Sequence, residues 1–306
     1  VDDDAIMWIV EGEDDLSVSF AARLMEQGLQ LRIVDKDINL SGKNLSRGSV
    51  VVIAMDNPGI SELTSTIKRT AQNLNISVSS LFSGFGPEEL PDWGGRHFRL
   101  LTKPQIAILS HEGFSSYDVG VSWWSLDHHL GIRHSQLNTS MIGYADLRRY
   151  NTLIMPSGYR SLDQNELSVL KDWVKQGGTL IANNSSTRML ISDKSITSIR
   201  DVSDSIENSH EYNIKLQREF LSKNISIDLD YVNNNKLTSD ISYPWEETEN
   251  RIDSDTLQKR DKWQSLFMPS GAFVSGRIDD KHWLTFGTIN TLPLLYSNYP
   301  ILMAGS

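Results

Sequence analysis

The sequence contains no cysteine in its 306 residues. This absence excludes disulfide bonds, zinc sites built from thiolates, and nucleophilic or redox-active cysteines in the chain. It indicates little about the cellular compartment, although chains without cysteine are suited to secretion in bacteria.

Positive charge and long apolar runs are also scarce. The chain has 29 Lys and Arg residues against 39 Asp and Glu, which gives a formal net charge of −10. A surface that binds phosphate backbones needs the opposite excess, so we expect no nucleic-acid partner. No apolar run reaches the roughly 18 residues of a membrane-spanning helix, so we expect no membrane span.

The composition that remains is typical of a globular protein, with 39% hydrophobic and 22% charged residues. The length suffices for two domains. The chain opens with Val1-Asp2-Asp3-Asp4, without an initiator Met or a charged-then-apolar signal segment. We therefore expect it to be a mature fragment or an excised piece of a longer protein.

Residues 1–102 predict a small α/β domain. Short apolar runs predict strands, and apolar residues at helical spacing predict two helices between them. The first helix carries Leu16, Phe20 and Leu24 on one face and ends at Gly28; Ser61 is the expected cap of the second. The expected strands are 6–10, 31–34, 50–54 and 76–80, the second helix is 60–74, and a Gly- and Pro-rich loop spans 83–95.

Residues 103–306 predict a second domain, in which buried strands alternate with helices. Wholly apolar runs at 105–109, 152–155 and 179–182 are typical of strands covered on both faces. The helix after the first strand ends at Gly131, and a capping box formed by Ser161 and Gln164 opens the helix after the second. This rhythm indicates a doubly wound parallel sheet.

A polar insertion interrupts the second domain at about residues 191–264, where Asn, Ser and Asp predominate. We expect helices near 196–206 and 214–221, a strand over 225–231, and a position outside the sheet for the insertion. The core of the sheet is expected to resume near Leu266, with closing strands over 272–278 and 283–286.

Three loops follow the carboxyl ends of the expected parallel strands, where ligands of such sheets bind. They span residues 110–113, 156–159 and 183–186. They offer imidazole, carboxylate, phenol, hydroxyl and amide groups to a ligand. The alternative is that they are ordinary turns with polar caps. The candidate ligand-binding residues are His111, Glu112, Ser157, Tyr159, Asn183 and Asn184.

Ser185 and Ser186 are the candidate nucleophiles, with His111 or His282 as the base. A nucleophile elbow is usually flanked by glycines because the turn is strained. Here the flanking residues are Asn and Thr. The alternative, that one of these serines caps the following helix, is therefore favoured.

No metal or nucleotide site is indicated. None of the seven histidines has an Asp or Glu three residues later, and adjacent His128 and His129 would point to different faces of a helix. Gly84-Phe85-Gly86 lacks the third glycine of a dinucleotide-binding turn. We therefore expect no cofactor and no metal in this chain.

Several stretches in series resemble the C-terminal region of large bacterial zinc carboxypeptidases that are similar to carboxypeptidase A. That region is a domain similar to class I glutamine amidotransferases, preceded by a small α/β domain. The resemblance implies a flavodoxin-like parallel sheet, a peptidase domain in the same polypeptide as partner, and a periplasmic or secreted location. The stretches are 104–109, 111–120, 150–159, 170–174, 177–182, 271–273 and 282–287, with 47–51 and 56–57 in the first domain.

The chain departs from this family in two ways. It lacks the His-x-x-Glu motif that holds zinc in the peptidase, so the zinc site must lie outside these residues. The elbow where active amidotransferases carry Cys falls at Asn183 or Asn184. The resemblance thus implies a non-catalytic accessory region of a zinc metallocarboxypeptidase. A serine hydrolase in its own right, or a module binding a sugar or peptide, stays open as an alternative.

Overall fold

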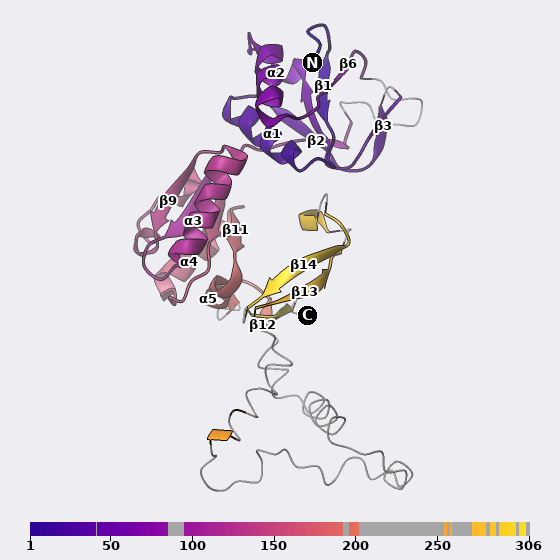
Figure 1. Ribbon diagram of the computed structural model, residues 1–306. Coiled ribbons are helices and arrows are strands. Elements are labelled where there is room, and N and C mark those ends of the chain that lie inside the picture. The colour runs from indigo at the N-terminus through magenta and orange to yellow at the C-terminus, as the bar shows by residue number, and fades with distance from the viewer. Residues whose placement is uncertain are drawn as a thin grey trace, which may run out of the picture. The chain divides into compact units, whose positions relative to one another are not determined.

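The structure is a computed structural model with a mixed α/β fold (Figure 1). It describes residues 1–40, 42–84, 95–191, 196–201, 254–255, 258, 271–279, 282–285, 288–297 and 300–303. The chain divides into one unit of Val1–Ser186 with Arg277–Leu292 and another of Thr187–Gly276 with Pro293–Ser306. The first unit contains a four-stranded parallel sheet and an antiparallel sheet, so the expected α/β class is confirmed at this level.

The first sheet is antiparallel, with strand order β6-β1-β5-β2-β7. Strands β3 and β4 form a separate hairpin, which lies between β2 and β5 along the chain. The sequence predicts four of these strands, but not β3, β4 or β7, because three residues are too few to show a period. The bounds are β1 Met7–Val10, β2 Leu31–Val34, β3 Ile38–Leu40, β4 Lys43–Leu45, β5 Val50–Ile53, β6 Ser79–Leu81 and β7 Phe98–Leu100.

Both faces of this sheet are covered, which explains why β1 and β5 are apolar throughout. On one face, Trp8 and Val52 are buried with residues of helices α1 (Leu16–Glu26) and α2 (Leu63–Leu74). On the other face, Ile9 is buried with residues of the β3–β4 hairpin and with Phe98. Each large apolar side chain buried in this way contributes about 1.5–3 kcal/mol to stability.

The two predicted helices of this domain are confirmed, but one predicted cap is wrong. Residue Gly28 follows α1 with a φ of 91°, in the left-handed region that glycine adopts readily. The residue at the start of α2 is Glu62, and its side chain makes no capping hydrogen bond. Ser61 lies one residue too early to accept a bond from the first turn.

The second sheet of the same unit is parallel, with strand order β11-β10-β8-β9. Its strands are β8 Ile106–Ser110, β9 His134–Asn138, β10 Thr152–Met155 and β11 Thr179–Ala182. Helix α3 (Ser116–Trp124) continues as the π-helical turn η2 (Ser125–Leu130), which ends at Gly131 with a φ of 71°. Helix α4 (Gln164–Lys175) joins β10 to β11. The sequence does not predict β9, because its residues are mostly polar.

Opposite faces of the parallel sheet are covered by different connections. Ile106 and Ile108 are buried with Leu126 of η2 on one face. Successive side chains of a strand point to opposite faces, and Ile154 of β10 packs on the first face, so Leu153 and Met155, both fully buried, lie on the other. The connections β8–α3–β9 and β10–α4–β11 run in opposite directions along the sheet. Because such crossovers are almost always right-handed, they cross opposite faces.

The 3₁₀ turns η3 (Thr139–Met141) and η4 (Leu147–Arg149) lie between β9 and β10. The indole N–H of Trp173, on α4, donates to the carbonyl oxygens of Leu147 and Tyr150 at 3.0 and 3.3 Å. This pair of bonds joins α4 to the η4 turn. Trp173 thus combines a buried ring with a satisfied polar group.

Two local predictions for the parallel sheet are wrong in detail. The capping box of α4 is formed by Asp163 and Glu166, whose side chains each accept from the other's backbone N–H at 2.8 and 2.9 Å. It does not use Ser161 and Gln164. Strand β11 is only partly covered, with Ile181 42% exposed, because it is an edge of the four-stranded sheet.

The C-terminal residues depart further from the predictions. Strand β13 (Ala272–Arg277) is confirmed, but it pairs with β14 (Thr291–Tyr296) and not with the parallel sheet. Residues 283–285 form the 3₁₀ turn η6 instead of a strand. Strands β12 (Arg200–Asp201) and β15 (Leu302–Met303) pair antiparallel, and helix α5 spans Thr187–Ile191.

Most of the predicted insertion, including its expected elements at 214–221 and 225–231, lies outside the described residues. Of the helix expected near 196–206, residues 196–201 are described, and they contain no helix. Among all residues that the structure describes, no helix has the length and hydropathy required to cross a bilayer.

Helix α1 contributes to both cores of the first unit. Phe20 and Leu24 are buried against the antiparallel sheet, whereas Ala22 is buried with Ile106 and Leu126 of the second core. The guanidinium of Arg23 donates to the carbonyl oxygens of His128 and His129 at 3.4 Å each. A cation at this position is favourable because carbonyl groups at a helix C-terminus carry partial negative charge.

Ion pairs at the end of α1 extend this junction. A carboxylate oxygen of Glu26 lies 2.8 Å from Nε of Arg133 and 3.3 Å from Nζ of Lys103. Burial raises the pKa of Glu26, but the hydrogen bonds from Arg133 and Lys103 outweigh it and hold that pKa below its ordinary value. Charged Glu26 therefore stabilises the folded chain.

Glu26→Gln is expected to lower the free energy of unfolding by about 0.5–1.5 kcal/mol at neutral pH, because two charge-assisted bonds are weakened. A lowered folded-state pKa gives stability that is present above the unfolded pKa of about 4.3 and lost as pH falls through the folded pKa. Urea midpoints of the two proteins should therefore converge in acid. Asp172→Asn, on the exposed side of α4, is the control; a pH-independent difference for Glu26→Gln contradicts the assignment.

Candidate functional site

The predicted candidate residues lie at the carboxyl ends of β8, β10 and β11, which are neighbours in the parallel sheet. The connections leaving β8 and β10 run in opposite directions at this point. In open parallel sheets such a reversal leaves a crevice between adjacent loops, and ligands bind there. We call the loops 110–116, 156–160 and 183–186 together the carboxyl-edge site.

Backbone hydrogen bonds join the first two loops of this site. The N–H of Ser115 donates to the carbonyl oxygen of Ser157 at 2.8 Å, and the N–H of Tyr159 donates to that of Gly113 at 2.9 Å. Phe114 and Gly158 form an antiparallel bridge between the same segments. The ends of β8 and β10 are thus held in one arrangement by the main chain itself.

Ser185 ties the third loop to the second. Its hydroxyl donates to the carbonyl oxygen of Gly158 at 2.8 Å, and its Oγ accepts from the N–H of Gly158 at 3.1 Å. The hydroxyls of Ser157 and Ser185 lie 2.7 Å apart. Since the single proton of Ser185 is directed at a carbonyl group, Ser157 is the donor in that pair.

Ser186 is fully buried and is bound to the main chain. Its Oγ lies 2.7 Å from the carbonyl oxygen of Asn183 and 3.0 Å from that of Met155. Both hydroxyls donate to loop or strand carbonyl groups, and the expectation that Ser185 or Ser186 caps the following helix stays a prediction. In the part of the chain that the structure describes, Ser185 has no hydrogen bond to a histidine.

Unusual backbone conformations gather at this edge. Three described non-glycine residues have positive φ, and two of them are His111 (72°) and Asn184 (53°). The third, Asn75, ends helix α2, where this conformation is common. Gly113 also has a positive φ, of 89°. Strained residues that a surrounding structure maintains are concentrated at functional sites in proteins.

The predicted histidines have separate surroundings. Nδ1 of His111 lies 2.7 Å from the hydroxyl of buried Ser110, and the imidazole itself is exposed beside exposed Glu112. Nδ1 of His282 accepts from the N–H of Leu284 at 3.1 Å, within the turn that contains η6. Tyr159 is 86% exposed at the rim of the carboxyl-edge site. His111, Glu112 and Tyr159 are therefore available to a ligand.

A buried ion pair behind the site was not predicted from the sequence. Nη2 of Arg160 lies 2.6 Å from Oε1 of Glu166, whose side chain is only 5% exposed. The aliphatic stem of Arg160 lies against Gly113, where an added Cβ would come within 2.2 Å of the Arg160 Cβ. The positive φ of Gly113 and this close approach both require glycine. The Asp163-x-x-Glu166 spacing is the signal that the sequence offers, but the predicted box was placed at Ser161 and Gln164, and neither spacing reveals Arg160.

The chemistry of this edge is that of hydrogen bonding. The described residues contain no group of three His, Asp or Glu side chains placed to hold a metal ion. Arg160, the cation within the three loops, is engaged by Glu166. The loops therefore offer a polar surface with one imidazole, one carboxylate and one phenol.

Comparison of the chain with protein-family models, with curated proteins and with solved structures yields no match. The function is therefore inferred from the strand order, the loop geometry and the hydrogen bonds described above.

Ser185→Ala should destabilise the chain by about 1–3 kcal/mol, because it removes the bonds between two loops and leaves the buried Gly158 N–H without an acceptor. Chemical denaturation is the measurement. Ser168→Ala, at an exposed position of α4, should change the stability by less than about 0.5 kcal/mol. Equal effects of the two substitutions would show that the link between the loops contributes nothing.

Gly113→Ala should cost more than Gly177→Ala. Both glycines have positive φ, 89° and 102°, so backbone strain should lower the folding stability of each alanine variant by about 1–2 kcal/mol. Only at Gly113 does the new Cβ also meet Arg160; nothing lies within 4 Å at Gly177. Thermal or urea denaturation of the matched pair separates the clash from the strain. A smaller loss for Gly113→Ala would contradict the close approach.

Proposed function

We propose that this chain is a non-catalytic accessory region of a bacterial zinc carboxypeptidase. Its parallel sheet corresponds to a domain similar to class I glutamine amidotransferases in which the nucleophile position holds asparagine. The strand order β9-β8-β10-β11 supports this assignment, since a flavodoxin-like sheet begins with the order 2-1-3-4 and is doubly wound. Crossovers on opposite faces of the sheet agree with it.

The observation that carries the proposal is the backbone of Asn184. This residue follows the end of β11, has a φ of 53° and opens the turn η5 (Asn184–Ser186). An elbow nucleophile occupies a strained turn of this kind directly after a strand. An amide side chain there has no nucleophilic oxygen or sulfur, so acyl transfer has no attacking group at this position.

The neighbouring serines do not replace the missing nucleophile. Activation of a serine requires its hydroxyl proton to point at a base. The Ser185 hydroxyl points instead at the carbonyl oxygen of Gly158, and Ser186 is buried. These contacts favour the accessory function over a serine hydrolase.

In this function the chain acts through its surfaces. The peptidase domain of the same polypeptide is the partner and carries the zinc outside this chain, and the location is periplasmic or secreted. Helix α1 holds the antiparallel and parallel sheets against each other, so the first unit can support a neighbouring domain as one body. The expected effects are stabilisation of the peptidase or orientation of its substrate.

A binding module at the carboxyl-edge site is the second candidate. It is favoured by the strained backbone of His111 together with the exposed Glu112 and Tyr159. A sugar or a peptide has the hydroxyl and amide groups that these side chains recognise. A ligand that binds only the folded chain would raise its melting temperature.

The isolated chain is expected to hold no stoichiometric zinc, to show no carboxypeptidase activity, and to leave a fluorophosphonate probe unreacted. No zinc and no peptidase activity are expected because the chain lacks the zinc motif. No reaction with the probe is expected because the serine hydroxyls of the carboxyl-edge site are already hydrogen-bonded to the main chain. Metal analysis and probe labelling of folded and unfolded chain are the measurements. Labelling of Ser185 or Ser186 in the folded chain but not in the unfolded chain would contradict the accessory function and support the serine hydrolase.

Sequencing the coding region around this chain tests whether the chain is part of a zinc carboxypeptidase. We expect a signal peptide and a module with His-x-x-Glu and a distant His in the same reading frame. A reading frame without a peptidase module would refute the accessory function.

A further inference from the structure

Helix α3 leaves large apolar side chains uncovered. None of its nine residues is buried, although the helix connects two strands of the parallel sheet. Tyr117 is 88% exposed, Val121 66%, Trp123 42% and Trp124 52%. Single exposed apolar residues are common, but several on one short helix form a contiguous patch, and patches of this kind mark interaction sites.

A glycine that the fold of the chain does not require lies at the centre of this patch. Gly120 is inside α3, and its backbone lacks the positive φ that favours glycine. An added Cβ would meet nothing within 4 Å beyond the backbone of its own helix, so alanine fits there. Glycine in a helix interior is less stable than alanine. A position that costs stability without a packing reason inside the chain points to a molecule that approaches the helix backbone from outside.

Aromatic side chains surround Gly120 on the helix surface. Residues three or four positions apart are neighbours on a helix, so Tyr117 lies on one side of the glycine and Trp123 and Trp124 lie on the other. The remaining neighbour at this spacing is Ser116, so none of the four carries a charge. Trp and Tyr are enriched, and most charged residues depleted, at the centres of protein–protein interfaces.

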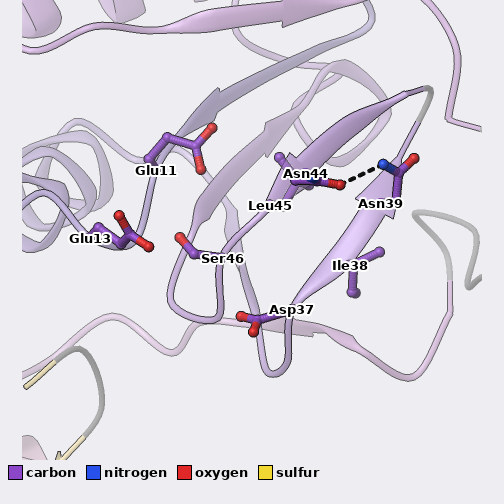
Figure 2. Close-up of a pocket in the computed structure, with 8 residues that line it drawn as sticks. All are labelled: Glu11, Glu13, Asp37, Ile38, Asn39, Asn44, Leu45 and Ser46. Atoms are coloured by element: carbon purple, nitrogen blue, oxygen red, sulfur yellow. Dashed lines mark hydrogen bonds between the residues drawn. The ribbon is translucent and has the colours of Figure 1, made fainter.

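The shape of the patch also favours a protein partner over a small ligand. Small molecules bind in concave sites, whereas the outer face of a helix is convex. The hollow drawn in Figure 2 lies elsewhere, between the loop after β1 and the β3–β4 hairpin, and no residue of α3 lines it. A partner of α3 therefore has to bring a surface of its own, such as a second helix that crosses at the glycine.

A second copy of α3 complements this patch. A two-fold axis at Gly120 places glycine against glycine and reverses the second helix, so that a residue after the glycine meets one before it. Trp123 and Trp124 of each copy then meet Tyr117 of the other, and the contact occurs twice. Aromatic pairs of this kind contribute more than the area they bury. We infer that two copies of this chain associate through α3, with Gly120 at the crossing point.

The exposed aromatic area suffices for a modest dimer. A covered aromatic side chain buries about 150–250 Å², so the three rings leave about 350 Å² open on each copy. Two copies together supply about 700 Å², which is enough for the apolar centre of an interface near the lower end of the standard range of about 1,200–2,000 Å². Polar residues around the patch supply the rim. The expected dissociation constant lies in about the micromolar range.

The net charge gives this dimer a distinctive salt dependence. Each chain has a formal charge of −10, so two copies repel each other at long range, while the aromatic contact itself is uncharged. The dimer should become tighter as salt rises from about 0.05 to about 0.5 M, because salt screens the repulsion. A complex with a cationic partner would weaken instead. The inference rests on α3 alone and is independent of the accessory function.

The test is sedimentation equilibrium of the full chain between about 1 and about 200 μM. The chain should pass from monomer to dimer over this range. Gly120→Gln covers the crossing point with a side chain for which the monomer has room, and it should weaken dimerisation at least about tenfold. Tyr117→Ser removes the ring that meets the two tryptophans and should weaken it to a similar extent.

Two substitutions outside α3 are the matched controls. Ser168→Gln adds the same side chain at an exposed position of α4, and Tyr144→Ser removes a ring that is 84% exposed. Both should leave the dimer unchanged, and circular dichroism verifies that all variants fold. A chain that stays monomeric at about 200 μM overturns the inference. So does a dimer that weakens with salt, that Gly120→Gln and Tyr117→Ser leave intact, or that the controls weaken equally.

Discussion

The first unit depends on one helix that is buried on two sides. Phe20 and Leu24 of α1 complete the core of the antiparallel sheet, and Ala22 completes a core of the parallel sheet. A side chain larger than Ala22 would separate the two cores, because a close-packed interior has no room for additional atoms. Arg23 and Glu26 then add polar bonds around this apolar contact. The relative placement of two sheets thus follows from the surface of α1.

The carboxyl-edge site combines a rigid frame with few chemical groups. Main-chain bonds join the loops after β8 and β10, and Ser185 joins the loop after β11 to them. The hydroxyls that a nucleophilic mechanism would use are consumed by this framework. What stays available is His111, Glu112 and Tyr159. A frame of this kind suits recognition better than acyl transfer, in agreement with an accessory function.

The carboxyl-edge site carries the charge of one exposed carboxylate, that of Glu112, because Arg160 and Glu166 compensate each other. The net charge of −10 favours cationic partners over anionic ones for the chain as a whole.

The sequence by itself determined most elements of both sheets, since apolar runs and helical spacing act over neighbouring residues. Local patterns of this kind predict helices α1 to α4 and strands β1, β2, β5, β6, β8, β10, β11 and β13, and the loops of the carboxyl-edge site follow from the strand ends. The tertiary structure alone decided the antiparallel pairing of the first sheet, the short strands β3, β4 and β7, and the polar strand β9. It also decided what Ser185 binds, because Gly158 is distant in sequence and adjacent only once β10 and β11 pair. Hydrogen bonds and ion pairs between loops depend on how strands align, and no local pattern of residues records that alignment.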